Sequence, residues 1–392
     1  MILVFALGCS AEPTFDVCAA PTTESPQLDA GWTGWAHILG DAELAPSVRA
    51  RFHAPRAGAR ALTAAVVLHG SWEDAGIAAD APIVDAPDVV TVQLDYPGGG
   101  GSEGVGDRRG ASARAAVAAV LGWAAGTVVD SDGCTLPTRA PGVAGPPVLV
   151  GASNGGNLAV ASLADPALAL PELAGVVTWE TPSDAAFATV AYGNDPTVYT
   201  PDTCVLDDDG AVSCAVPDRV RLARSSEGLC FDVGFDGGCD AADPRVGFVR
   251  DPSGVHVYAP FIATLIEESG IVDDAMSRAD TDLWWAERSA TRAAAAAVAR
   301  WPDLPFLLLG SAEDHVLAWP DHAHVWALGE ALQRAGARWT RLNPGTVDGW
   351  EPNPVDLPLR LDDRQGELLP EEAESPLDGL LGAAVTELAA LR

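Results

Sequence analysis

The sequence has few basic residues. Lysine and arginine together number 23, against 55 aspartates and glutamates, which gives a formal net charge of −32. Phosphate backbones and anionic lipid headgroups repel a chain of this charge, so nucleic acids and anionic membrane surfaces are excluded as partners. The acidity itself is explained by solubility and says nothing about the fold.

Long apolar runs and nucleotide-binding motifs are also missing. After the N-terminus no stretch reaches the roughly 18 apolar residues that a membrane-spanning helix needs. The glycine run at 98–101 has neither the lysine nor the serine or threonine of a P-loop, and no dinucleotide-binding pattern occurs with the correct spacing. We therefore expect no cofactor. Hydrophobic residues make up 48% of the chain, which is ample for a core.

The N-terminus lacks the basic residues that usually begin an export signal. Residues 1–9 are an apolar run that ends in Ala-Leu-Gly-Cys. This pattern resembles a bacterial lipoprotein signal, in which Cys9 is lipidated and becomes the mature N-terminus. The resemblance implies an exported protein of the cell envelope, periplasmic or at the cell surface, that meets the membrane only through this anchor. Residues 10–30, rich in Pro, Thr, Ser and Glu, are typical of a tether.

The cysteine spacing argues against a zinc site, because no C-x₂-C pair occurs. Besides Cys9 the chain has six cysteines, and an even number in an exported chain favours disulfides. Cys204 with Cys214, and Cys230 with Cys239, would each close a short polar loop, and Cys18 and Cys134 then remain to pair with each other. The expected disulfides are Cys204–Cys214, Cys230–Cys239 and Cys18–Cys134.

Residues 147–159 predict a strand, a sharp turn and a helix. Gly151 and Gly155 lie two residues on either side of Ser153, the G-x-S-x-G spacing of a nucleophile elbow. The serine there occupies a strained turn, where a Cβ at either glycine would collide with neighbouring backbone. The helix that follows directs its N-terminal N–H groups to where an oxyanion forms. The alternative is a glycine-rich strand-to-helix turn without catalytic function.

Short apolar strands alternate with helices along most of the chain, which is typical of a mostly parallel central sheet with helices on both faces. The core is expected in residues 31–183 and 301–392. From 184 to 300 the alternation breaks down, and we interpret this part as an insertion over the carboxyl edge of the sheet. Edge strands are expected near 35–39 and 48–53, and further strands at 62–70, 89–96, 147–150, 173–179, 304–310 and 338–342. Helices are expected at 112–125, 258–269, 282–298, 323–335 and 376–391.

Three motifs occur in an order typical of one family. A strand ends in His69-Gly70, the turn at Ser153 follows, and a late strand leads into Gly310-Ser311-Ala312-Glu313-Asp314. In these motifs, over about residues 60–183 and 300–345 and the final helix, the chain resembles the α/β-hydrolase family. The resemblance implies the α/β-hydrolase fold, with the disulfide-containing insertion as its cap.

The resemblance also assigns roles to residues. It implies that Ser153 is the nucleophile and that Asp314 is the acid of a catalytic triad. The backbone N–H groups of Asn154 and of Ser71 or Trp72 would hold the oxyanion. Two further carboxylates are alternatives to Asp314, namely Glu313 and Glu180, and His69 is expected to be structural.

The catalytic histidine of the family is missing from its usual place. It would follow the last strand, but residues 343–375 contain no histidine, and Asp348 there cannot act as that base. A serine hydroxyl is a poor nucleophile without a base. Because a triad is defined by geometry and not by order in the chain, a histidine elsewhere can serve. The candidates are His315, His322, His324 and, in the insertion, His256.

Two functions are compatible with these features. The first is an exported serine hydrolase that cleaves a carboxylic ester, a thioester or a short peptide bond through an acyl-enzyme at Ser153. Its substrate would be a small-molecule ester or peptide. The alternative, motivated by the missing histidine, is a catalytically inactive α/β-hydrolase-like binding protein of the cell envelope. A minor third is a metal-assisted hydrolase, in which the histidine cluster, Asp314 and Asp321 hold the metal.

Overall fold

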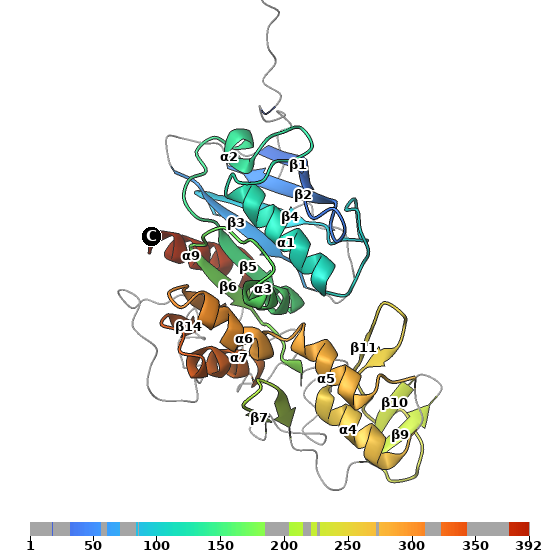
Figure 1. Cartoon of the computed structure of the whole chain (residues 1–392). Helices are drawn as coiled ribbons and strands as arrows, with labels where there is room; N and C mark the ends of the chain where they lie inside the picture. The colour runs from blue at the N-terminus through green and yellow to red at the C-terminus, as the bar shows by residue number, and fades with distance from the viewer. Residues whose placement is uncertain are drawn as a thin grey trace, which may run out of the picture.

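The computed structural model describes residues 18, 32–55, 61–70, 84, 86–184, 204–214, 221–225, 228–271, 274–309, 323–342 and 376–391. The largest sheet in this part of the chain consists of β1 (Trp32–Leu39), β2 (Ser47–Ala54), β3 (Thr63–Leu68), β4 (Val89–Leu94), β5 (Val148–Ala152), β6 (Gly175–Trp179), β13 (Phe306–Leu309) and β14 (Thr340–Leu342). The strand order is β1-β2-β4-β3-β5-β6-β13-β14 (Figure 1). All pairs from β4 to β14 are parallel, while β2 is antiparallel to β1 and β4. The predicted mostly parallel sheet is confirmed.

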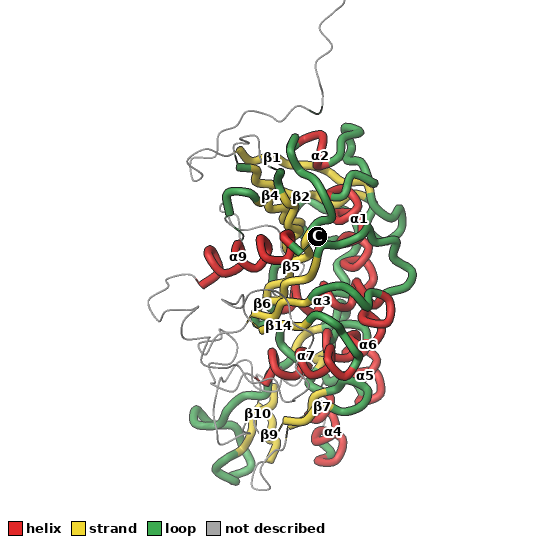
Figure 2. The backbone as a smooth tube through the Cα atoms, turned by 90° about the vertical axis from the view of Figure 1, so that its left-hand side faces the viewer, coloured by secondary structure: helices red, strands yellow, loops and turns green. Residues whose placement is uncertain are grey.

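Helices cover both faces of this sheet (Figure 2). One face carries α1 (Ala111–Ala124), α3 (Asn154–Ala164), α6 (Ala290–Arg300) and α7 (Ala323–Arg334), and the other carries α9 (Pro376–Ala390). Successive side chains of a strand point to opposite faces. On β3, Val66 and Leu68 accordingly join the core under α1 and α3, and Ala65 and Val67 join the core under α9. Burial on both faces explains the continuous apolar runs in the sequence.

The chain leaves the large sheet after β6 and returns to it at β13. In between lie α4 (Pro260–Ser269), α5 (Arg278–Ala286) and the short strands β7 (Cys204–Leu206), β8 (Val212–Cys214), β9 (Arg221–Ser225), β10 (Gly228–Asp232), β11 (Val249–Arg250) and β12 (His256–Val257). The strands pair as β7–β8, β9–β10 and β11–β12. Figure 1 shows β9, β10, β11, α4 and α5 together at one end of the molecule. By contrast, α6 packs against α3 and α7.

The prediction of one helix over 282–298 is wrong. The structure has two helices there, α5 and α6, which are separated at residues 287–289. The buried side chain of Asn157 on α3 accepts a hydrogen bond from the Ala290 backbone N–H at 2.8 Å. This contact satisfies one of the N–H groups that a helix start leaves without a partner, and so favours a new helix at this position.

Two of the three expected disulfides are confirmed. Cys18 is bonded to Cys134 and Cys230 to Cys239. Backbone register places Cys204 directly opposite Cys214 in the β7–β8 ribbon. Their side chains lie outside the described residues, so a bridge between them stays a prediction.

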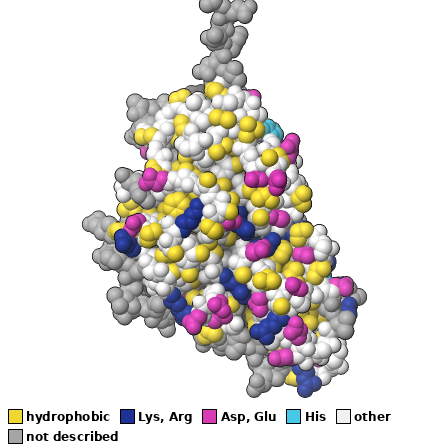
Figure 3. Space-filling view, in the orientation of Figure 1, with side chains coloured by type: hydrophobic (Ala, Val, Ile, Leu, Met, Phe, Trp, Pro, Cys, Tyr) yellow, Lys and Arg dark blue, Asp and Glu magenta, His cyan; other side chains and the backbone are white. Residues whose placement is uncertain are grey.

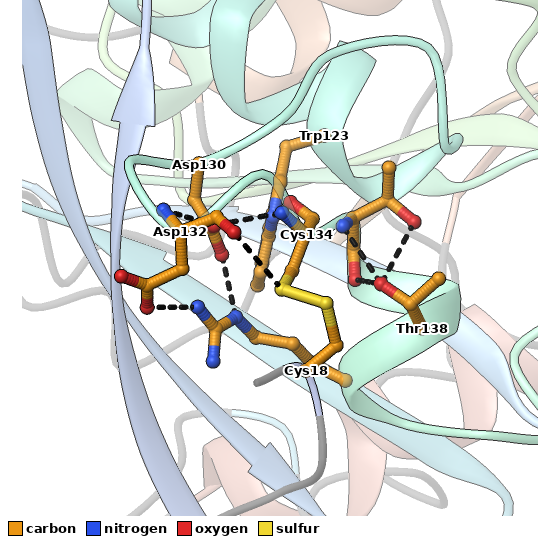
Figure 4. Close-up of polar contacts among 8 residues, drawn as sticks. Cys18, Trp123, Asp130, Asp132, Cys134 and Thr138 are labelled. Atoms are coloured by element: carbon orange, nitrogen blue, oxygen red, sulfur yellow. Dashed lines mark hydrogen bonds and ion pairs between the residues drawn. A yellow bond between two sulfur atoms is a disulfide. The ribbon is translucent and has the colours of Figure 1, made fainter. Parts of the chain in front are cut away.

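A buried ion pair lies next to the Cys18–Cys134 disulfide (Figure 4). Asp130, only 1% exposed, accepts hydrogen bonds from the backbone N–H groups of Asp132 and Cys134 and pairs with Arg139 Nε at 2.5 Å. Arg139 also contacts the exposed carboxylate of Asp132 at 2.6 Å. Because its oxygens have several donors, the Asp130 charge is compensated despite burial.

His53, buried on β2, is held neutral by its partners. Its Nε2 accepts a hydrogen bond from Arg51 Nε at 2.7 Å, so Nδ1 carries the proton and faces Thr33 Oγ1 at 2.9 Å. A proton on Nε2 would place two N–H donors against each other and would break the hydrogen bond from Arg51. Burial, and then the charge of Arg51, lower the pKa of His53 from 6.5 to about 4.

The depressed pKa of His53 predicts a loss of stability in acid. Between pH 6.5 and about 4 the unfolded chain gains a proton on this histidine that the native protein does not accept. The contribution of His53 is complete above pH 6.5, and as the pH falls to about 4 it lowers the free energy of unfolding by roughly 3 kcal/mol. Urea denaturation at stepwise pH should show that His53→Gln loses this dependence, whereas His37→Gln, at an exposed site on β1, keeps it. Identical pH profiles for wild type and His53→Gln would contradict the prediction.

Candidate functional site

Ser153 occupies the strained turn between β5 and α3. Its backbone has φ +51° and ψ −124°, a conformation that costs a non-glycine residue free energy of about 1–3 kcal/mol. The Ser153 N–H donates to the Trp179 carbonyl at 2.7 Å, and its carbonyl accepts from the Gly156 N–H at 2.9 Å. The residue is 8% exposed. The turn is therefore fixed from both sides, with the serine at the carboxyl end of β5.

The glycines of the turn are required by close backbone contacts. A Cβ on Gly151 would lie 2.5 Å from the Gly156 Cα. A Cβ on Gly155 would overlap the Leu68 carbonyl oxygen and lie 2.7 Å from its carbon. One on Gly156 would overlap the Thr181 hydroxyl. The G-x-S-x-G spacing thus allows α3 to start directly against β3 and β5.

Asn154 is the first residue of α3, so its N–H belongs to the free N-terminal groups of the helix. Its side chain accepts from Asn157 Nδ2 at 3.4 Å, and Asn157 also donates to the Pro182 carbonyl at 2.9 Å. The side chain of Asn154 is thereby held among the residues of α3. The assignment of its backbone N–H as an oxyanion donor stays a prediction.

The backbone after β3 lies against Ser153. A Cβ on Gly70 would lie 2.9 Å from the Ser153 Cβ and 3.4 Å from its Oγ. Gly70 thus lies beside the nucleophile, whereas the residues after it, from which the second oxyanion donor is expected, lie outside the described part of the chain. Only a glycine allows this distance, because any side chain would occupy the space beside the Ser153 hydroxyl.

His69 packs beneath this loop. Its ring lies 4.4 Å from the Tyr96 ring, and its Nδ1 lies 3.1 Å from the Gly70 carbonyl. Burial, and then the charge of Arg109, lower its pKa from 6.5 to about 4. His69 is thus neutral at neutral pH and is held in aromatic packing, in keeping with the structural role expected for it.

Glu180 lies beside the serine turn. It directly follows Trp179, whose Cα is paired with Ala152 in the sheet, and its N–H donates to the Leu309 carbonyl at 2.8 Å. Its φ is +44° and it is 2% exposed. A buried carboxylate in a strained conformation at this edge keeps Glu180 as an alternative to Asp314 for the acid.

His256 lies in the insertion among aromatic rings. It belongs to β12, is 8% exposed and stacks on Phe248 with ring centroids 4.0 Å apart. The Tyr258 hydroxyl lies 3.5 Å from its Nδ1. These contacts favour a packing role for His256.

The other predicted site residues lie outside the described part of the chain. They are Cys9, Ser71, Trp72, Glu313, Asp314, His315, Asp321, His322 and Asp348. The backbone of His324 is in the first turn of α7, but its side chain is not described. The roles of all of them stay predictions.

The described residues contain no group of three or more His, Cys, Asp or Glu side chains arranged to hold a metal ion. The described helices are all too short or too polar to span a bilayer. On the face drawn in Figure 3, acidic and basic side chains are interspersed among apolar ones.

No protein-family model matches the chain, and no curated protein sequence matches it. Many solved structures are loosely similar to the chain, and three of them serve as examples. Brefeldin A esterase, a bacterial homologue of human hormone-sensitive lipase, shares 16% identity over 83% of this chain and 72% of its own, with a TM-score of 0.38. Carboxyl esterase 2 of the fungus Tuber melanosporum shares 13% over 85% and 81%, with a TM-score of 0.39. Pyrococcus horikoshii acylaminoacyl peptidase shares 8% over 80% and 37%, with a TM-score of 0.42.

The chain has the α/β-hydrolase fold. The assignment rests on the order and direction of the strands and on the strained serine turn at the end of β5. The resemblance noted in the sequence is thus confirmed at the level of the fold. Fold alone does not establish activity, which depends on the site.

Proposed function

We propose that the protein is an exported serine hydrolase that cleaves an ester, thioester or short peptide bond through an acyl-enzyme. One observation carries the proposal, namely that Ser153 lies on a strained turn, between the N-terminus of α3 and the backbone of Gly70. Residues held in strained backbone conformations cluster at active sites, where the strain is part of the mechanism. The two export signals, a lipoprotein-like Cys9 and disulfides that suit an oxidising compartment, support a location in the cell envelope.

In the proposed reaction Ser153 Oγ attacks the substrate carbonyl carbon while an imidazole takes its proton. The N–H groups of Asn154 and of Ser71 or Trp72 stabilise the oxyanion, and the carboxylate of Asp314 or Glu180 orients the imidazole. The leaving alcohol, thiol or amine departs with the proton. Water, activated by the same imidazole, then cleaves the acyl-enzyme and restores Ser153.

The experiment is covalent labelling with a fluorophosphonate probe. Wild type is expected to be labelled, and Ser153→Ala to lose all labelling and all hydrolysis of short-chain p-nitrophenyl esters. Ser162→Ala is the matched control, because Ser162 is a buried serine of α3, the helix that Ser153 precedes, and its hydroxyl has no hydrogen-bond partner among the described residues. It should label like wild type. Single alanine substitutions of His256, His315, His322 and His324 then identify the base.

A second candidate function is ligand binding without catalysis. It is favoured by the absence of histidine from residues 343–375, where the catalytic base would be expected. A binding protein of the cell envelope with a serine that has no base would keep the fold and the turn. Wild type that is folded, yet neither labelled nor active, would contradict the hydrolase and support this alternative.

A further inference from the structure

Arg109 is a buried cation in the loop that follows β4. It is 1% exposed and has φ +68°, next to Arg108 with φ +54°. One guanidinium nitrogen, Nη2, donates to two carbonyl oxygens, that of His69 at 3.3 Å and that of Gly70 at 2.9 Å. These are the last two carbonyls before the residues expected to supply an oxyanion donor.

Tyr96 completes this arrangement. Its hydroxyl donates to the same His69 carbonyl at 3.0 Å. The Arg109 guanidinium carbon lies 3.4 Å from the centroid of the Tyr96 ring, and the His69 ring lies 4.4 Å from it. The guanidinium is therefore held by a cation–π contact as well as by hydrogen bonds, and its position is closely defined.

The direction of a carbonyl determines the direction of the next N–H. The Gly70 C=O and the Ser71 N–H belong to one planar peptide group and point in opposite directions when that peptide is trans. A donor that holds the Gly70 oxygen therefore also fixes the plane of the peptide group that follows Gly70. Gly70 itself lies within contact distance of the Ser153 side chain.

We propose that Arg109 is a positioning residue for the proposed oxyanion hole. By holding the Gly70 carbonyl beside Ser153, it fixes the orientation of the peptide group that follows Gly70, from which an oxyanion donor is expected. The inference rests on the proposed hydrolase function. The arginine acts through the backbone and does not touch the substrate. Its effect should therefore be seen in transition-state stabilisation and not in substrate binding.

Arg288 holds in place the loop between β4 and α1 that carries Arg109. Arg288, between α5 and α6, donates through Nη2 to the Asp107 carbonyl at 3.1 Å and through Nε to the Arg108 carbonyl at 3.0 Å. The Asp107 carboxylate accepts from the backbone N–H groups of Gly110 and Ser112 at the start of α1. The loop is thus bonded to α1 on one side and to Arg288 on the other, and these contacts limit the movement of Arg109.

The test compares Arg109→Met and Arg109→Lys with Arg300→Met. Arg300 is a matched control, because it also donates to backbone carbonyls, among them that of Leu163 at 3.4 Å, but at the C-terminal end of α3. We expect kcat/KM for a p-nitrophenyl ester to fall about 100-fold in Arg109→Met, with KM changed less than threefold. The affinity for a trifluoromethyl ketone, which forms a tetrahedral oxyanion on the serine, should fall in parallel. Arg300→Met should keep both.

Arg109→Lys keeps the charge but not the planar donor, and should lose most of the same activity. It also serves if Arg109→Met does not fold. Folded Arg109 variants with kcat/KM within threefold of wild type would overturn the inference alone. So would a loss that is entirely in KM, with unchanged affinity for the ketone. Wild type without labelling or hydrolysis would overturn the proposed function and this inference together.

Discussion

Gly155→Ala is expected to destabilise the protein by about 3 kcal/mol or more and to abolish labelling of Ser153. The new Cβ would overlap the Leu68 carbonyl oxygen and approach the carbonyl oxygen of His69 to 3.0 Å. Both belong to the backbone at the end of β3, which is bonded to β4 and β5 and cannot move aside. The helix would have to shift away, and with it the turn that carries the serine.

Urea denaturation and probe labelling measure the two effects. Gly234→Ala in the insertion is the matched control, because the nearest atom to its Cβ would be Asp232 Oδ1 at 3.9 Å. It should change the free energy of unfolding by less than about 1 kcal/mol and leave labelling intact. If Gly155→Ala were as stable and as reactive as Gly234→Ala, the close approach of α3 to β3 would not exist in solution.

Asp130→Ala is expected to cost about 3–5 kcal/mol of stability, because it leaves Arg139 buried without its main counter-ion. It also removes the acceptor for the N–H groups of Asp132 and Cys134. The free energy of unfolding, measured with the disulfides intact, reports the loss. The candidate active site should be unaffected, and the folded variant should label like wild type.

The control for this change is the second carboxylate on the same arginine. Asp132, whose side chain is 53% exposed, pairs with Arg139 at 2.6 Å, a distance similar to that of Asp130. Asp132→Ala is expected to cost only about 0–1 kcal/mol, since water replaces an exposed ion pair. Equal losses in the two variants would show that burial is not what makes the Asp130 contact important.

Most of the features that could be predicted from the sequence are local ones. The exception is the Cys18–Cys134 disulfide, which spans 116 residues and was predicted only by elimination. The strands of the parallel sheet were evident because both of their faces are buried, which leaves short apolar runs between turns. The serine turn was evident because a strained strand-to-helix junction needs glycine at fixed offsets. The Cys230–Cys239 disulfide was evident because its cysteines lie close together in the chain. In each case the residues that interact are near one another in sequence.

The features that could not be predicted depend on partners far away in the chain. The start of α6 at Ala290 is capped by Asn157, which is 133 residues earlier. The contacts of Arg109 could not be predicted, because its partners are the carbonyls of His69 and Gly70, about 40 residues earlier in the chain. The short strands of the insertion have too few residues for a periodic pattern.

The candidate site shows the same division. The turn and its glycines follow from the pattern around Ser153, because the backbone conformation there excludes side chains at defined positions. The approach of Gly70 to the serine, the burial of Glu180 beside it and the contacts of Arg109 with the His69 and Gly70 carbonyls arise only when β3, β4, β5 and β6 pair in register. Pattern in a sequence reports constraints between neighbouring residues, whereas a site at the edge of a parallel sheet is assembled from segments that only folding brings together.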